Sequence, residues 1–178
     1  MDIFLTLEAA ILLGVSYLLG SVPFGLVLTR MAGLGDIRTI GSGNIGATNV
    51  LRTGRKGLAL ATLLLDAGKG AIAVLLALAL STHAGLTAAA GAAAFLGHCF
   101  PVYLGFKGGK GVATFFGTLF AVNWLVGLIA GATWGLMAAV FRISSLAGIS
   151  AGIAAPIVTF LIEGGSPASV SAWPWVGI

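Results

Sequence analysis

The sequence predicts an all-α integral membrane protein, a polytopic transmembrane helical bundle. Three observations predict this fold. First, 58% of the 178 residues are hydrophobic and only 8% are charged. Second, the mean hydropathy is +1.10. Soluble domains carry about 25% charged residues, so this chain has too few charges to cover a surface in water. Third, the apolar residues form runs of roughly 20 residues, the length that a spanning helix needs.

The apolar runs divide the chain into its expected helices. They are residues 3–28, 57–80, 86–104, 112–141 and 143–162. These runs are too long and too rich in alanine and leucine for barrel strands, and a helix satisfies its own backbone polar groups in lipid. Frequent glycine and alanine within the runs suit close helix–helix approach. We expect a single membrane-embedded domain covering residues 1–178.

The charged residues predict an orientation. Basic residues gather in three connections: Arg30, Arg38, Arg52, Arg55 and Lys56 in the first, Lys107 and Lys110 in the second, and Arg142 in the third. The opposite ends carry Asp2, Glu8 and Glu163. The positive-inside rule therefore predicts that the N-terminus is outside and that these three connections are cytoplasmic. Trp173 and Trp175 would suit the membrane interface.

The run 112–141 needs an even number of crossings, because both of its ends are predicted to be cytoplasmic. About 30 residues make roughly 45 Å of helix, too long for one ordinary crossing and too short for two. We expect a hairpin of short or broken helices that turns near Asn123 and Trp124. That hairpin gives six spanning or partly spanning helices. The alternative is one long tilted helix, which would place Arg142 outside.

Composition also limits the function. One cysteine, Cys99, and two histidines are too few and too scattered for a metal cluster, so we expect no metal and no cofactor. The basic residues form no stripe on a soluble domain, so we expect no nucleic-acid partner. The acidic N-terminus lacks the basic region of a cleavable signal peptide.

The stretch GSGNIGATNVLR, residues 41–52, is the first candidate site. Its glycines permit close backbone approach to a ligand, and consecutive free N–H groups form anion-binding nests. Arg52 adds a planar fork suited to phosphate oxygens. The alternative is an ordinary connecting loop with a helix N-cap.

The stretch GFKGGKGVAT, residues 105–114, comes close to a nucleotide P-loop but departs from it. Lys110 is followed by glycine, the spacing back to Gly105 is one residue short, and no strand precedes the loop. Backbone N–H groups, the two lysines and the following helix N-terminus could still face a phosphate. The alternative is that Lys107 and Lys110 only mark the membrane interface.

Three further positions are weaker candidates. Asp66 and Lys69 lie three residues apart on one helix face, and they either fix helix packing as an ion pair or border a polar cavity. His98 lies in the third run, either as a packed, hydrogen-bonded residue or as part of the site. Ser145, after Arg142 and Ser144, is expected to be a helix N-cap. Together these groups are the kind that a site for phosphorylated substrates uses.

In this order, GSGNIGATNVLR, DAGKG, GHCFPVYLGFKGGKGVAT and SSLAG resemble the bacterial acyl-phosphate-dependent glycerol-3-phosphate acyltransferases, the PlsY family. The resemblance covers about residues 17–156. It implies an inner-membrane bundle of seven helices whose active site faces the cytoplasm. It also implies transfer of a fatty acyl group from acyl phosphate to the 1-hydroxyl of glycerol 3-phosphate. The product would be lysophosphatidic acid, an intermediate of phospholipid biosynthesis.

The resemblance also implies residue roles. Ser42, Arg52, Lys110 and Ser145 are expected to hold the substrate phosphates and to form the catalytic set. The expected substrate-binding residues around them are Gly43, Asn44, Gly46, Thr48, Asn49, Asp66, Lys69, His98, Lys107, Gly108, Gly109, Gly111 and Thr114. Catalysis would come from positioning and charge stabilisation, with a substrate phosphate accepting the hydroxyl proton. We expect a monomer in contact with membrane lipid.

The sequence departs from the family in one place. Family members continue through a last helix into a cytoplasmic tail that carries a functional histidine and asparagine, whereas this sequence stops at Ile178. We therefore expect a weak or inactive enzyme, a catalytically impaired truncated homologue. The other alternative is a small-solute transporter that uses Asp66 and Lys69 along a pathway. The sequence of such a transporter is expected to contain inverted repeats, and none is visible here.

Overall fold

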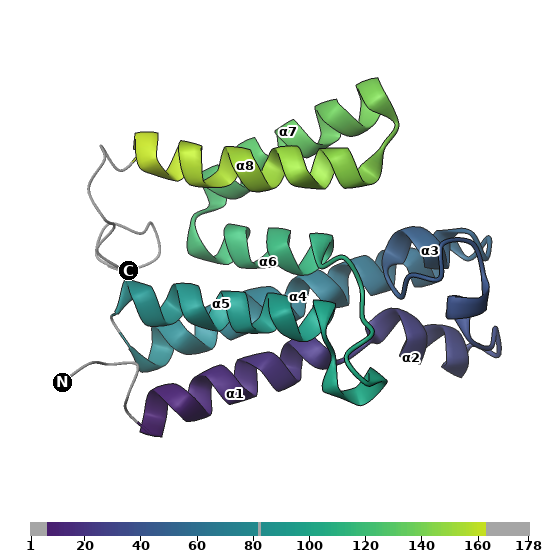
Figure 1. The fold of residues 1–178 in the computed structure, drawn as a ribbon, viewed down its shortest axis with the longest axis horizontal. Helices are drawn as coiled ribbons and strands as arrows, with labels where there is room; N and C mark the ends of the chain where they lie inside the picture. The colour runs from purple at the N-terminus through teal and green to yellow at the C-terminus, as the bar shows by residue number, and fades with distance from the viewer. Residues whose placement is uncertain (1–6, 82, 163–178) are drawn as a thin grey trace.

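The computed structural model describes residues 7–81 and 83–162, and these residues form helices and loops with no strand. In chain order the helices are α1 (Leu7–Ser21), α2 (Phe24–Met31), η2 (Ile37–Thr39), α3 (Ala47–Leu51), α4 (Lys56–Leu80), α5 (Ala84–Cys99), η3 (Val102–Leu104), α6 (Val112–Val122), α7 (Trp124–Phe141) and α8 (Ser144–Ile162). The predicted all-α fold is confirmed for this part of the chain (Figure 1). Asp2, Glu163, Trp173 and Trp175 lie outside the described residues.

The predicted first helix, residues 3–28, is wrong in detail. The run divides into α1 and α2, which meet at an angle of 41°. Pro23 stands at the break. Proline lacks a backbone N–H and clashes with the preceding turn, so a helix seldom continues through it unbent. A proline also ends the third run early, because α5 ends at Cys99, two residues before Pro101.

The break predicted near Asn123 and Trp124 is confirmed. α6 ends at Val122, and α7 begins at Trp124. The side-chain oxygen of Asn123 accepts from the backbone N–H groups of Leu125 and Val126, at 3.0 and 3.3 Å, and so caps α7. Figure 1 shows α6 and α7 running in opposite directions, so the single long helix is excluded.

The helices include several of membrane-spanning length. Four described spans are long and apolar enough to cross a bilayer, and α1 with α2 makes a fifth as a bent pair. α6 has 11 residues, roughly 16 Å of helix, and reaches only part of the way through a 30 Å hydrocarbon core. The described helices therefore match the six spanning or partly spanning helices that we predicted.

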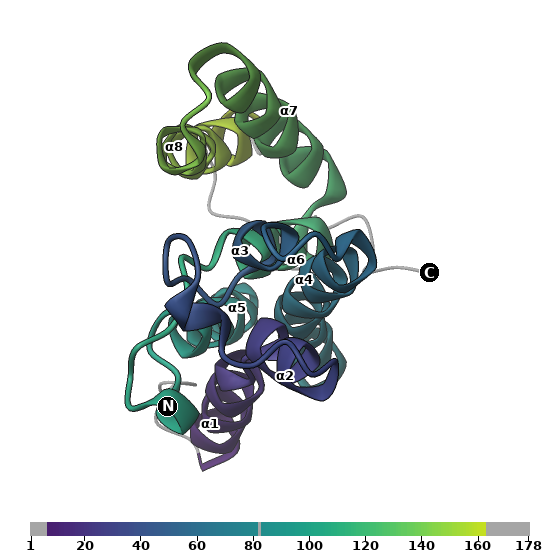
Figure 2. The ribbon, with the colours of Figure 1, turned by 90° about the vertical axis from the view of Figure 1, so that its right-hand side faces the viewer.

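Glycines let the helices pack closely. α1 packs on α5, α4 on α6, and α7 on α8. A methyl group at Gly20 would overlap the backbone of Ala94, and one at Gly117 would overlap the backbone of Ala67. α7 and α8 form a layer of their own beyond α6 (Figure 2). Large apolar side chains such as Leu64 and Phe160 are exposed, as expected for surfaces that face lipid.

The basic connections lie toward one end of the bundle. Figure 1 shows α2, α3 and the turn between α7 and α8 at the right-hand end. The connection from α4 to α5 lies at the opposite end. We name two segments at the first end: the Arg52 loop, residues 41–52, and the Lys110 loop, residues 105–111.

Candidate functional site

Two asparagines, Asn49 buried and Asn44 partly buried, shape the Arg52 loop. Asn49 is 1% exposed; its Oδ1 accepts from the backbone N–H of Ser42 at 3.3 Å, and its Nδ2 donates to the carbonyl of Ile37 at 2.8 Å. Asn44 Oδ1 accepts from the N–H of Gly46 at 3.1 Å. Asn49 therefore fixes the loop from beneath, while Ser42 remains exposed.

Arg52 lies across the start of its own loop. Gly41 has a φ of 56°, a conformation that favours glycine. A methyl group there would overlap the Arg52 guanidinium and lie 2.8 Å from its Cδ. Glycine at this position therefore lets the exposed Arg52 side chain lie against the loop backbone. Thr48, in α3, is also exposed.

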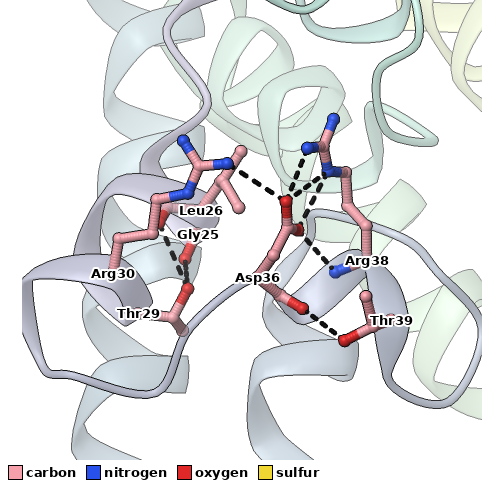
Figure 3. A network of polar contacts seen from close by, with 7 residues as sticks. All are labelled: Gly25, Leu26, Thr29, Arg30, Asp36, Arg38 and Thr39. Atoms are coloured by element: carbon pink, nitrogen blue, oxygen red, sulfur yellow. Dashed lines mark hydrogen bonds and ion pairs between the residues drawn. The ribbon is translucent and has the colours of Figure 1, made fainter.

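Asp36 is the only acid of the predicted cytoplasmic connections, and two arginines pair with it (Figure 3). Arg30 lies 3.1 Å from its Oδ2, and the Nε of Arg38 lies 2.9 Å from its Oδ1. The hydrogen bonds from Arg38, with a smaller effect of Arg30, hold the pKa of Asp36 well below its usual range. Asp36 is thus already neutralised by residues outside the Arg52 and Lys110 loops.

The Lys110 loop folds back along the end of α5. Gly108 N–H donates to the carbonyl of Cys99 at 3.1 Å, and Gly109 N–H donates to the carbonyl of His98 at 3.0 Å. A methyl group at Gly108 would overlap the His98 carbonyl oxygen. Gly111, with a φ of 73°, stands before the first residue of α6. Glycines therefore allow this close return of the chain.

The cations of the two loops have no acidic partner among the described residues. Of the three acids there, Glu8 stands at the start of α1, Asp36 pairs with Arg30 and Arg38, and Asp66 is buried beside Lys69. No described carboxylate lies within ion-pair distance of Arg52, Lys107 or Lys110. All three side chains are exposed. The charged ends of these three side chains are therefore free to bind an anion.

The two loops approach each other at Gly109, beside His98. A methyl group at Gly109 would overlap His98 Nε2 and lie 3.2 Å from Asn44 Oδ1. The Gly109 backbone therefore lies against the His98 imidazole edge and close to the Asn44 amide. Asn44 and His98, two predicted site residues, are 54 positions apart in the sequence. The structure places both of them close to Gly109.

The third predicted segment also reaches this end. α8 begins at Ser144, so Ser145 lies in the first turn of the helix, and its prediction as the N-cap is wrong. The N-cap position is Ile143, whose carbonyl accepts from the N–H of Ala147 at 3.1 Å, so the helix begins two residues earlier than the serine pattern predicts. A methyl group at Gly148 would lie 3.7 Å from Val112 Cγ2, in ordinary contact. This places the first turns of α8 beside the start of α6.

The remaining predicted residues are buried. Lys69 Nζ lies 2.8 Å from Asp66 Oδ1, and both side chains are at most 2% exposed. His98 Nδ1 lies 3.7 Å from the same oxygen. Thr114, in the first turn of α6, packs against Gly70 of α4. Of the two alternatives for Asp66 and Lys69, the described geometry fits the ion pair that fixes packing.

Sequence reasoning missed some residues that shape the site. Lys69 Nζ donates to the carbonyl of Val22 at 2.8 Å, across 47 residues, and no local pattern signals such a contact. Tyr17 donates its hydroxyl hydrogen to the carbonyl of Phe100 at 2.5 Å, which ties α1 to the end of α5. The pairing of Asp36 with Arg38 was also not predicted, although the two residues are only two positions apart.

The chain is similar to proteins of one family. The family model described as glycerol-3-phosphate acyltransferase matches residues 10–177. A glycerol-3-phosphate acyltransferase of Maricaulis maris is 71% identical over 141 residues, covering 79% of this chain and 64% of that protein. One from Jannaschia is 61% identical over 168 residues, covering 91% of this chain and 80% of the relative. The chain thus spans just under two thirds of the Maricaulis protein.

Solved structures agree with these relatives. The crystal structure of PlsY (YgiH), an integral membrane glycerol 3-phosphate acyltransferase, in its glycerol 3-phosphate form, has a TM-score of 0.81 and 41% identity. That match covers 92% of this chain and 80% of the solved chain. The lysophosphatidic acid form has a TM-score of 0.78 and 40% identity, over 88% and 78% of the two chains. A helical membrane fold, matching motifs and close relatives agree: the chain belongs to the glycerol-3-phosphate acyltransferase family.

Proposed function

We propose that this chain transfers a fatty acyl group from acyl phosphate to the 1-hydroxyl of glycerol 3-phosphate. The product is lysophosphatidic acid, and inorganic phosphate leaves. Family membership supports this reaction. The similar solved protein has a glycerol 3-phosphate form and a lysophosphatidic acid form, which match the acceptor and the product of the proposed reaction.

The observation that carries the proposal is the set of three exposed cations on adjoining loops. Arg52, Lys107 and Lys110 have no carboxylate partner among the residues that the structure describes. Both substrates carry phosphate, whose oxygens accept strong, charge-assisted hydrogen bonds from guanidinium and ammonium groups. Arg52 suits bidentate binding, while each lysine acts as a point charge. Two phosphates need several cations, which one loop alone does not supply.

The residues divide into two roles in this proposal. Ser42, Arg52, Lys110 and Ser145 hold the phosphates and form the catalytic set. Backbone and side-chain groups of the two loops and of the first α6 turn complete the substrate site: Gly43, Asn44, Gly46, Thr48, Asn49, Lys107, Gly108, Gly109, Gly111 and Thr114. Asp66, Lys69 and His98 belong to the same site, at its buried edge.

The proposed chemistry needs no basic side chain. The acceptor hydroxyl oxygen attacks the acyl carbonyl carbon, the bond between that carbon and the phosphate oxygen breaks, and an ester forms. The hydroxyl proton passes to a phosphate oxygen, whose second pKa is about 6, so that it can accept a proton near neutral pH. The protein contributes by holding both substrates in contact and by stabilising the charge on the leaving phosphate.

The charge pattern supports a placement in the cell. We propose that the loop end of the bundle faces the cytoplasm of a bacterial inner membrane and that the protein acts as a monomer. The excess of arginine and lysine in those connections supports this orientation. Membrane embedding suits a reaction whose donor and product both carry a fatty chain.

The donor is tested directly with purified protein in proteoliposomes. We expect labelled glycerol 3-phosphate and palmitoyl phosphate to give labelled lysophosphatidate, with one inorganic phosphate released per product. The protein concentration should be high enough to detect a single turnover. Palmitoyl coenzyme A in place of palmitoyl phosphate should give no product. Equal product from the thioester would contradict the proposed donor.

The transporter alternative is not favoured, since the family and the matched structures are those of an enzyme. The same proteoliposomes separate the two functions. The acyltransferase proposal predicts product without protein-dependent uptake of glycerol 3-phosphate. Uptake without product would contradict it and favour transport.

A further inference from the structure

A buried cluster of three ionisable side chains lies directly beneath the two loops. Asp66 and Lys69 come from α4, and His98 comes from the last turn of α5. Their side chains are at most 4% exposed. Ionisable groups buried within spanning helices are costly and are retained where they serve the site or its architecture.

Lys69 connects the cluster to the break between α1 and α2. Its ammonium donates to the carbonyl of Val22 at 2.8 Å and lies 5.7 Å from the ring centroid of Phe24. Phe24 is the first residue of α2, which leads toward the Arg52 loop. The ion pair with Asp66 therefore fixes α4 against the start of the segment that carries this loop.

His98 connects the cluster to the place where the two loops approach each other. Its Nδ1 faces Asp66 Oδ1 at 3.7 Å, longer than a hydrogen bond but within ion-pair distance. The opposite ring edge, at Nε2, lies against Gly109 of the Lys110 loop, and Asn44 Oδ1 of the Arg52 loop also lies close to Gly109. The His98 carbonyl accepts from Gly109 N–H at 3.0 Å. One imidazole thus lies between the buried carboxylate and the Lys110 loop.

We propose that the Asp66–Lys69–His98 cluster sets the distance between the Arg52 and Lys110 loops, with His98 as the positioning residue that packs against Gly109 where the two loops approach each other. This proposal rests on the proposed function, because the spacing matters only if the loops hold two substrates together. A misplacement of about 1 Å can lower the rate of such a reaction about 100-fold. A closely packed ring fixes the spacing better than a flexible side chain would.

A double-mutant cycle tests the contact between His98 and Gly109. Gly109→Ala places a methyl group on His98 Nε2 and should lower kcat about 100-fold, with a smaller change in the KM for glycerol 3-phosphate. In a His98→Ala background the same methyl has space, so Gly109→Ala should then cost less than 10-fold. Gly68→Ala is the control, because a methyl there meets nothing within 4 Å. Additive losses would overturn the proposed contact.

A conservative variant separates positioning from folding. His98→Gln keeps a planar polar group and should recover at least 10-fold of the kcat that His98→Ala loses. Both variants should remain monodisperse and retain the helical circular dichroism of the parent. If His98→Gln is as inactive as His98→Ala, the positioning role is wrong, and loss of the acidic limb of the kcat–pH profile in both variants would identify His98 as a proton acceptor.

A distance measurement tests the spacing without any turnover. Thr48 and Tyr103 are both exposed. Nitroxide labels at Thr48→Cys and Tyr103→Cys report the distance between α3, in the Arg52 loop, and η3, directly before the Lys110 loop. The background is Cys99→Ser, since Cys99 is the one native cysteine. We expect a narrow distance distribution in this background and a broader one after His98→Ala. An unchanged width would overturn the inference, and the result does not depend on whether acyl transfer is the reaction.

Discussion

Lys69 Nζ donates to the carbonyl oxygen of Val22 at 2.8 Å, at the point where α1 ends and Pro23 redirects the chain. Two residues 47 positions apart are thereby joined beneath the candidate site. The same ammonium pairs with Asp66 at 2.8 Å. Lys69 therefore donates to a carbonyl at a helix break and forms an ion pair with a buried carboxylate at once.

Lys69→Met should lower the free energy of unfolding by about 3–5 kcal/mol, because it leaves the Asp66 charge buried without a partner. The double variant Lys69→Met/Asp66→Asn should recover part of this loss, since it removes both charges. Reversible unfolding in detergent, followed by tryptophan fluorescence, measures both. If the double variant is less stable than the single one, the ion pair is not the reason for the loss.

The Asp36 cluster predicts a local pH response. Because Arg38 and Arg30 hold the pKa of Asp36 below its ordinary value of 3.8, its stabilising effect is complete above that value. The effect is lost only as the pH falls through the lower, folded value. After correction for intrinsic exchange, the Arg38 amide, which donates to Asp36 Oδ1 at 3.0 Å, should stay equally protected from pH 7 to pH 5.

Asp36→Ala should remove this protection, since the amide loses its acceptor. Arg30→Ala is the matched control, because it removes one ion pair and leaves the amide bond in place. Hydrogen–deuterium exchange of the peptide that contains residues 36–40 reports both variants. Equal protection in Asp36→Ala and the parent would show that the Asp36 carboxylate does not hold the segment of residues 36–40 in place.

The cap at Asn123 predicts a modest loss of stability. Asn123→Ala should cost about 1 kcal/mol, because the N–H groups of Leu125 and Val126 lose their acceptor. Asn123→Ser should retain most of the stability, since serine also caps helices well. Thermal unfolding of the two variants side by side tests the cap. A larger loss in Asn123→Ser than in Asn123→Ala would contradict it.

Close packing of α4 on α6 predicts a different cost at two glycines. Gly117→Ala should destabilise the protein by about 1–3 kcal/mol, because its methyl group would overlap the carbonyl of Ala67. Gly131→Ala, in α7, meets nothing within 4 Å and should be neutral or slightly stabilising. Detergent-induced inactivation rates compare the two. Similar rates would indicate that α4 and α6 are less closely packed than described.

Much of the fold could be predicted from the sequence because lipid imposes simple limits on helix length and charge. The lengths of the apolar runs and the placement of the arginines and lysines predicted the break near Asn123 before any contact was known. The same reasoning missed the break at Pro23, since the run 3–28 is apolar on both sides of the proline. Ser145 lies two residues after the N-cap position, because α8 begins at Ser144.

The candidate site was predictable in its loops but not in its interior. Glycines, Arg52, Lys107 and Lys110 form local patterns with a chemical meaning. The contacts of His98 with Gly109 and of Lys69 with Val22 depend on how α1, α4 and α5 pack, and side-chain packing between distant segments leaves no local pattern. The roles of these residues in binding and catalysis stay predictions.

The central claim is that Arg52 and Lys110 hold substrate phosphate, and equilibrium binding tests it most directly. Binding of radiolabelled glycerol 3-phosphate needs no turnover. Arg52→Ala and Lys110→Ala should each weaken it at least 10-fold, about 1.4 kcal/mol, because each removes a charge-assisted contact to phosphate. Lys56→Ala, an exposed cation at the start of α4, is the control and should bind like the parent. Parent-like binding by both Arg52→Ala and Lys110→Ala would contradict the claim.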